Sequence, residues 1–328
     1  MRGSPRKPLL RRLERAIFEP QALPPSLVTV LALAPSILAA LLLFRVRAAL
    51  VLALALAAGG AAHGVLRLLG SRTRVSPVVA ALVGVGLLGP RAALPWLVAV
   101  AAGAVLLEVL RARLCSALPL ETGLLAFAAV VLARGAAVAG YGDEPIRLWL
   151  DGAQPLDPLQ LYVGVAAGPV FAASLLAVVV GAGWAWYARR VNVLVVAGFL
   201  AGGLGPALIW RWPLPATLET APLWFTVAFV LSDPARLPPH RSLQVTIGVV
   251  AGALALELHG HHVALAGSLV VLAGIHTAVA VGIAVQRLTA RPQPRARQPA
   301  RPSAPPLPAQ LPPGPPPPAL PPPGGTLR

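Results

Sequence analysis

The chain has 328 residues, of which 57% are hydrophobic and 12% charged, and its mean hydropathy is +0.75. Apolar runs recur along most of this length, which excludes a soluble globular protein and predicts an all-α polytopic membrane protein. The net charge of +16 does not indicate nucleic-acid binding, because Lys and Arg lie at the ends of apolar runs and in the termini, where lipid headgroups explain them. The single cysteine, Cys115, excludes a disulfide within the chain and an iron–sulfur cluster built from this chain alone.

The two ends of the chain differ in composition from the apolar middle. Residues 1–25 mix Arg and Lys with Leu, Ile and Phe, which is typical of a basic amphipathic segment at the cytoplasmic surface of a membrane; a solvated basic tail is the alternative. Residues 289–328 are rich in proline and have almost nothing to bury. They are therefore predicted to be a disordered cytoplasmic tail.

Ten apolar segments lie between these ends and define a transmembrane domain at 26–288. They cover residues 27–44, 48–69, 76–89, 92–110, 122–139, 161–187, 191–210, 222–231, 243–258 and 263–286. The third and the eighth segment are short for a span, because a helix rises about 1.5 Å per residue and the hydrocarbon core is about 30 Å thick.

Arginine is concentrated in alternate loops between these segments. If the N-terminus is cytoplasmic, the cytoplasmic loops hold Arg67, Arg72, Arg74, Arg111, Arg113, Arg189, Arg190, Arg236 and Arg241. The opposite loops hold fewer cations and an acidic stretch. By the positive-inside rule, this asymmetry predicts a multi-pass protein of the inner (plasma) membrane with both termini cytoplasmic.

The short segments occupy matching places, since each is the third in a group of five. An odd number of segments per half inverts the second half relative to the first, and interrupted segments at matching places indicate a site at the interface of two repeats. Two inverted five-segment repeats are a hypothesis here, because the two halves share no convincing sequence identity.

The eighth segment breaks at Ser232, Asp233 and Pro234, within the stretch WFTVAFVLSDPARLPPHR at 224–241. Backbone freed at membrane depth is tolerated only where it is buried in protein or lines a wet cavity. Ser232 and Asp233 are therefore candidates for binding a cofactor or an ion. The alternative is an Asp-Pro turn that ends the short helix, and both roles can hold together.

Other polar residues have two interpretations each. His63 and His276 lie inside predicted spans, where they could serve as paired haem ligands or as buried core histidines. Glu257, His259, His261 and His262 have metal-ligand chemistry but also make an ordinary polar turn. The glycines at 202–205 are predicted to allow close helix packing or a kink, because no strand precedes them and no Lys follows. We predict no catalytic residue and no metal site.

Three stretches together resemble the NqrB/RnfD family, the flavin-carrying membrane subunits of sodium-pumping NADH:quinone reductase and of Rnf electron-transport complexes. VLSDP at 230–234, followed by Arg241, is similar to the family's ATDP…GR signature. SLLAVVVG at 174–181 is similar to its SALAILLG helix, and GAQPL at 152–156 lies where the family has SGATPL. In the family, the Thr of that last motif carries flavin mononucleotide (FMN) through a phosphoester bond.

The departures from the family pattern bear on function. Gln154 takes the place of the flavin-bearing Thr, and an amide has no hydroxyl to form a phosphoester. Ala172 and Ala173 replace an acidic residue and a Thr of the family's next motif. The asparagine-rich turn expected between residues 111 and 127 is not recognisable.

The resemblance therefore implies a divergent family member without covalent FMN, in which any FMN is bound non-covalently. Such a protein is an integral membrane subunit of an ion-translocating electron-transport complex, with the lipid bilayer and the other subunits as partners. It is at most a subunit of an oxidoreductase. A cofactor-free channel or carrier for a small solute is the alternative, since such proteins also use paired short helices. A structural assembly subunit is a further one.

Overall fold

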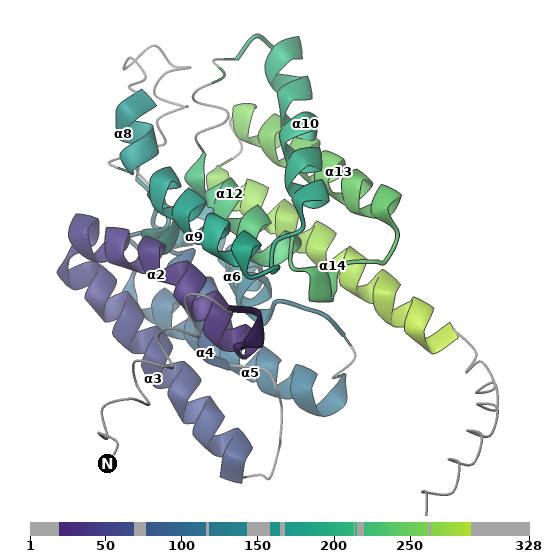
Figure 1. The fold of residues 1–328 in the computed structure, drawn as a ribbon. Coiled ribbons are helices and arrows are strands. Elements are labelled where there is room, and N and C mark those ends of the chain that lie inside the picture. Colours follow the sequence, from purple (N-terminus) through teal and green to yellow (C-terminus); the bar gives the residue numbers. More distant parts are fainter. Residues whose placement is uncertain are drawn as a thin grey trace, which may run out of the picture. The chain divides into compact units, whose positions relative to one another are not determined.

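The computed structural model describes residues 20–68, 77–115, 118–142, 158–164, 168–212, 214, 220–261 and 264–289 (Figure 1). All regular structure in these residues is helical. The chain divides into two units, Met1–Arg287 and Leu288–Arg328, and almost every described residue belongs to the first. Most of the predicted amphipathic N-terminal segment and nearly all of the predicted proline-rich tail lie outside the described residues.

Five helices are long and apolar enough to cross a bilayer, with 20 to 25 residues each. They are α2 (Pro25–Phe44), α3 (Val46–Leu68), α5 (Leu94–Leu114), α13 (Arg241–Gly260) and α14 (Leu265–Thr289). Large apolar side chains such as Leu42, Leu106 and Leu254 are exposed on their outer faces, as expected for helices surrounded by lipid. The prediction of an α-helical membrane protein is confirmed.

Shorter apolar helices of 10 to 17 residues lie between these long ones in the chain. They are α4 (Pro77–Gly86), α6 (Thr122–Arg134), α9 (Leu175–Tyr187), α10 (Val193–Ile209) and Ala221–Leu231, which consists of α12 (Ala221–Thr226) and a π-helical turn, η4 (Val227–Leu231). The two segments that were predicted to be short, 76–89 and 222–231, are helices of ten and eleven residues.

The predicted continuous segment 161–187 is wrong. The structure has a short helix α8 (Pro158–Val163), then a 3-10 turn η3 (Val170–Ala172), and only then α9. Gly164 adopts a φ of +100°, which turns the chain, and the Ser174 side chain accepts a hydrogen bond from the Ala177 N–H that starts α9 anew. Hydropathy did not reveal this break because the residues around it are nearly all apolar.

The predicted segment 122–139 also ends early, since α6 stops at Arg134. Gly135 follows with a φ of +88° and begins a separate 3-10 turn, η2 (Ala136–Ala139). The Ala139 carbonyl then accepts a hydrogen bond of 2.6 Å from the Gly89 N–H, just after α4. This loop therefore fixes the end of the first short helix.

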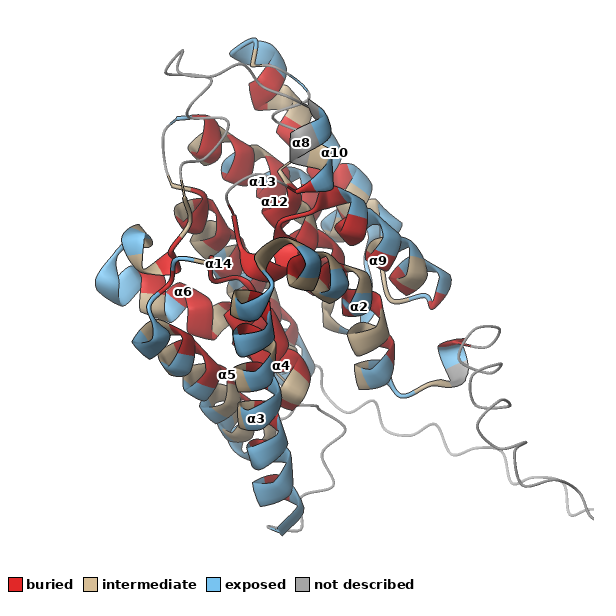
Figure 2. Cartoon of the chain, turned by 90° about the vertical axis from the view of Figure 1, so that its left-hand side faces the viewer, coloured by how far each residue is buried: buried red, intermediate tan, exposed pale blue. Residues whose placement is uncertain are grey.

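Both short helices lie in the interior of the first unit. Nine of the ten residues of α4 are buried, and so are all five residues of η4. Figure 2 shows much of α4 in red, whereas α3 carries many exposed residues. The neighbouring helices thus cover the two short ones, α3, α5 and α6 packing on α4 and α9 and α10 packing on η4.

Glycine allows α10 and α13 to approach each other closely. A side chain added at Gly202 would meet the Val249 carbonyl, and one added at Gly252 would meet the Phe199 carbonyl. The interpretation of the glycines at 202–205 as a packing motif is confirmed for Gly202 and Gly203, which are both buried.

Candidate functional site

The break in the second short helix is stabilised by hydrogen bonds within the protein. After the π-helical turn, the Ser232 hydroxyl donates to the Ala228 carbonyl at 2.8 Å, and the Ser232 N–H donates to the Val227 carbonyl at 2.9 Å. The Ser232 carbonyl accepts from the Asn192 N–H at 2.8 Å, at the start of α10. The predicted break is therefore confirmed, and the freed backbone groups have partners. π-helical turns of this kind are frequent at functional sites.

Asp233 directly follows the break and has two roles. Its Oδ1 accepts from the Ala235 N–H at 3.0 Å, which begins the 3-10 turn η5 (Pro234–Arg236). Its Oδ2 lies 3.2 Å from Nε of Arg236. Asp233 is thus both a turn residue and a member of a charged cluster.

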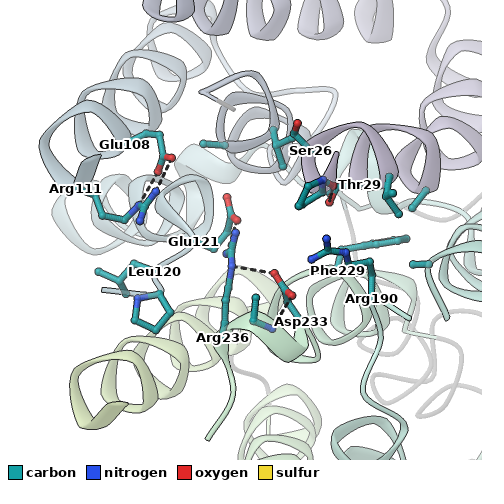
Figure 3. Close-up of a pocket in the computed structure, with 18 of the residues that line it drawn as sticks. Ser26, Thr29, Glu108, Arg111, Leu120, Glu121, Arg190, Phe229, Asp233 and Arg236 are labelled. Atoms are coloured by element: carbon teal, nitrogen blue, oxygen red, sulfur yellow. Dashed lines mark hydrogen bonds and ion pairs between the residues drawn. The ribbon is translucent and has the colours of Figure 1, made fainter. Parts of the chain in front are cut away.

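Arg236 joins this broken helix to the loop between α5 and α6. Its guanidinium forms a second ion pair, with Glu121, whose side chain is only 5% exposed (Figure 3). Burial alone would lower the pKa of Arg236, but the negative charges of Glu121 and Asp233 outweigh it and raise that pKa above its ordinary value. Two carboxylates therefore share one permanent cation.

Glu121 is also held by α14. Its backbone N–H donates to Nε2 of His276 at 2.9 Å, and its Oε1 accepts from the Gly123 N–H at 3.4 Å at the start of α6. Because Nε2 accepts a hydrogen bond, His276 is neutral and carries its proton on Nδ1. Two residues from late in the chain, Arg236 and His276, thus hold one loop from its first half.

A third ion pair, between Glu108 and Arg111, lines the same cavity as these two. Glu108 binds Arg111 through both carboxylate oxygens, at 3.0 Å to Nε and 2.9 Å to the terminal nitrogen. The Thr122 hydroxyl donates to Glu108 at 3.0 Å, and Arg111 donates to the Leu118 carbonyl at 3.2 Å. The Glu108 side chain is 3% exposed and is neutralised where it stands.

A cavity of about 310 Å³ opens between these groups. Its walls include Val79 and Ala80 of α4 and Ala228 and Phe229 of η4, so both short helices contribute. The charged residues that line it are Glu108, Arg111, Glu121, Arg190, Asp233, Arg236 and Arg287. Figure 3 shows several of them around the opening, opposite Ser26 and Thr29 of α2.

The residues predicted for the site do not all lie at the cavity. Asp233 lines the cavity, whereas Ser232 is fully buried and its hydroxyl is engaged in ending the helix. Gln154 lies outside the described residues. His63 is exposed on α3, and the Nε2 of His276 is engaged by Glu121, so the two histidines have different surroundings.

The polar turn after α13 forms its own small cluster. Glu257 accepts from Trp210 Nε1 at 3.0 Å and lies 3.0 Å from Nε2 of His261, whose ring packs edge-on to Trp210. His259 is buried, and His262 lies outside the described part. No group of three or more His, Cys, Asp or Glu that could hold a metal ion is found in the part of the chain that the structure describes.

Sequence reasoning missed Glu108 and Glu121, and it treated Arg111 and Arg236 only as signals of membrane orientation. The signal in the sequence that could have found them is the position of Glu108 within an apolar run and of Glu121 just before another. A carboxylate within or next to an apolar helix is costly in a membrane, and it is usually paired and functional.

Comparison of the chain with models of protein families and with curated proteins finds no match. Fold and site together define an α-helical membrane protein with a charged cavity between two short buried helices.

Proposed function

We propose that this chain is the membrane-embedded subunit of an ion-translocating electron-transport complex of the Rnf or Nqr kind, a divergent NqrB/RnfD member without covalent FMN. The observation that carries the proposal is that both short buried helices wall a single charged cavity, where the second one breaks at a motif resembling the family's ATDP signature. Short or broken helices at matching places mark the translocation site of many membrane transporters.

In this proposal, the ten apolar helices are ten membrane segments in two inverted halves, α2 to α6 and α9 to α14. Contacts between corresponding helices support this arrangement. The first helices of the halves, α2 and α9, pack against each other, and the second and fourth helices are in contact in both halves, α3 with α5 and α10 with α13. With both termini cytoplasmic, α5 and α9 would end on the cytoplasmic side, and the cavity residues Arg111 and Arg190 at these ends would then face the cytoplasm.

Arg236 and Glu121 would then control the ion path. They connect the broken helix of the second half to a loop of the first half, so a relative movement of the halves must break or reform this ion pair. Redox steps in partner subunits would supply the energy for that movement. Gln154 does not fit phosphoester-linked FMN, because its amide has no hydroxyl, so the proposed path uses no flavin bound covalently at this position.

A cofactor-free carrier for a small solute is the second candidate. The cavity volume of about 310 Å³ favours it, since this lies at the lower end of the range of small-molecule sites, about 300–1,000 Å³. In such a carrier, the two halves would rock against each other and break and reform the Arg236–Glu121 ion pair, without redox partners.

Spectroscopy of the protein purified in mild detergent from its source membranes tests the proposal. We expect visible absorption from co-purifying redox subunits, and no flavin that stays with this chain after acid precipitation. A chain that purifies alone and colourless would contradict the first candidate and favour the carrier. Flavin precipitating with the chain would show that the alignment of Gln154 with the attachment residue is wrong.

A further inference from the structure

We infer that the cavity binds a small phosphate-bearing anion through the guanidinium of Arg190. The inference deepens the proposed function, because it assigns a ligand class to the same cavity. The first observation is the charge of the cavity wall, which contains four arginines and three carboxylates.

The three carboxylates already have cationic partners. Glu108 is bound by Arg111 through both oxygens, while Glu121 and Asp233 share Arg236. Arg287, on α14, has contacts of its own. Arg190 therefore has no carboxylate left to neutralise it, and the lining as a whole carries one positive charge more than it has negative ones.

Arg190 is half-buried, and its side chain makes no hydrogen bond or ion pair with any residue that the structure describes. Its position is nevertheless well defined. Arg189 adopts a φ of +56°, which reverses the chain after α9, and the Arg190 N–H then donates to the Ala185 carbonyl at 2.7 Å. Arg189 is consequently exposed, whereas Arg190 lines the cavity.

The surroundings of Arg190 in the cavity come from η4, from the turn that follows it and from α2. Phe229 of η4 offers an apolar wall, and Asp233 after it is engaged by Arg236 and Ala235. The Ser26 hydroxyl of α2 makes no hydrogen bond among the described residues, so it is available to a ligand (Figure 3). A partly desolvated cation beside an apolar wall gains from an anion that replaces its lost hydration.

The guanidinium selects the ligand chemistry. Arginine binds phosphate with two parallel hydrogen bonds, and the cavity has room for a phosphate with a small group attached. Two sources offer this chemistry at a cytoplasmic surface, a free phosphate compound and the headgroup of an anionic lipid.

The test measures binding of inorganic phosphate to the full chain in an uncharged detergent, by calorimetry and by thermal stabilisation at constant ionic strength. Wild type and Arg189→Gln are compared with Arg190→Gln. Arg189 is the matched control, because it is adjacent, of the same charge and exposed. We expect phosphate to bind the first two and to bind Arg190→Gln at least tenfold more weakly.

A second arm measures melting temperatures in nanodiscs of phosphatidylglycerol or of phosphatidylcholine without added phosphate, and it then repeats the phosphate titration in both kinds of nanodisc. If a lipid headgroup is the source, phosphatidylglycerol raises the melting temperature of wild type and of Arg189→Gln but not of Arg190→Gln, and it displaces inorganic phosphate. If the source is a free compound, the two lipids give equal melting temperatures and phosphate still binds.

The inference is overturned if wild type responds to neither phosphate nor phosphatidylglycerol, or if the two glutamine variants respond equally. Arg190→Lys, which keeps the charge, should retain part of the binding and checks that the site is intact. Neither arm requires redox partners. A colourless chain that binds phosphate at Arg190 would thus contradict the electron-transport proposal alone, and a pigmented complex without binding would contradict this inference alone.

Discussion

At the scale of single residues, the site depends on charges that neutralise one another in a poorly solvated place. Glu121 and Glu108 are almost fully buried, and each has an arginine within ion-pair distance. Removing one partner of a buried pair leaves an uncompensated charge, which costs more than the pair contributes. The position of the break at Asp233 was predictable from the proline after it. The partner of Arg236 was not, because Glu121 lies more than a hundred residues away.

Replacing Arg236 with Gln should destabilise the protein by about 3 kcal/mol, because Glu121 keeps its charge and loses its partner. Chemical unfolding in detergent would measure this loss. Arg241→Gln is the control, since Arg241 is exposed at the start of α13, and its effect should stay within about 0.5 kcal/mol. Equal effects of the two substitutions would show that the Arg236 ion pair contributes nothing. The double variant Arg236→Leu/Glu121→Leu should be more stable than Arg236→Leu alone, because it removes both charges.

At the scale of elements, backbone features decided where helices begin, break and meet. The apolar run at 161–187 contains a break that composition does not reveal, because Gly164 and Pro169 lie among other small or apolar residues. The close packing of α10 on α13 depends on glycines at the contact, because a side chain at these positions would meet the backbone of the other helix. Because these contacts are steric, adding a single methyl group at one of the glycines should measurably lower the stability of the protein.

Gly202→Ala should lower stability by about 1–3 kcal/mol, because its new methyl group would meet the Val249 carbonyl and force α10 away from α13. Gly205→Ala, on the same helix but facing open space, should be neutral or stabilising by up to about 1 kcal/mol. Thermal unfolding of both variants in the same detergent gives the comparison. If Gly205→Ala is as damaging as Gly202→Ala, helix propensity rather than packing explains the effect.

At the scale of the whole molecule, the proposed inverted halves make a prediction about sidedness. Cys115, the only cysteine, is exposed at the end of α5, which the proposed topology places in the cytoplasm. A membrane-impermeant maleimide should therefore label it in inside-out vesicles and not in intact cells. Cys115→Ser should abolish the labelling.

The sidedness of further loops, including those of the second half, can be tested with single cysteines introduced into the Cys115→Ser variant. Arg91→Cys and Arg211→Cys, both at exposed positions, should be labelled from outside, and Arg241→Cys only from the cytoplasmic side. Labelling of positions 211 and 241 from the same side would rule out a crossing by the second short helix and, with it, the inverted repeat.

Composition and local pattern are enough to predict an α-helical membrane protein with two short apolar segments, the second of which breaks at Ser232, Asp233 and Pro234. These features are local, because apolar length and a proline act through residues close in the chain. The folded chain alone reveals that both short helices wall one cavity, that Arg236 and His276 hold Glu121, and that Arg190 lacks a side-chain partner among the described residues. These contacts join residues far apart in the chain, and their energy exists only once the helices have packed around them.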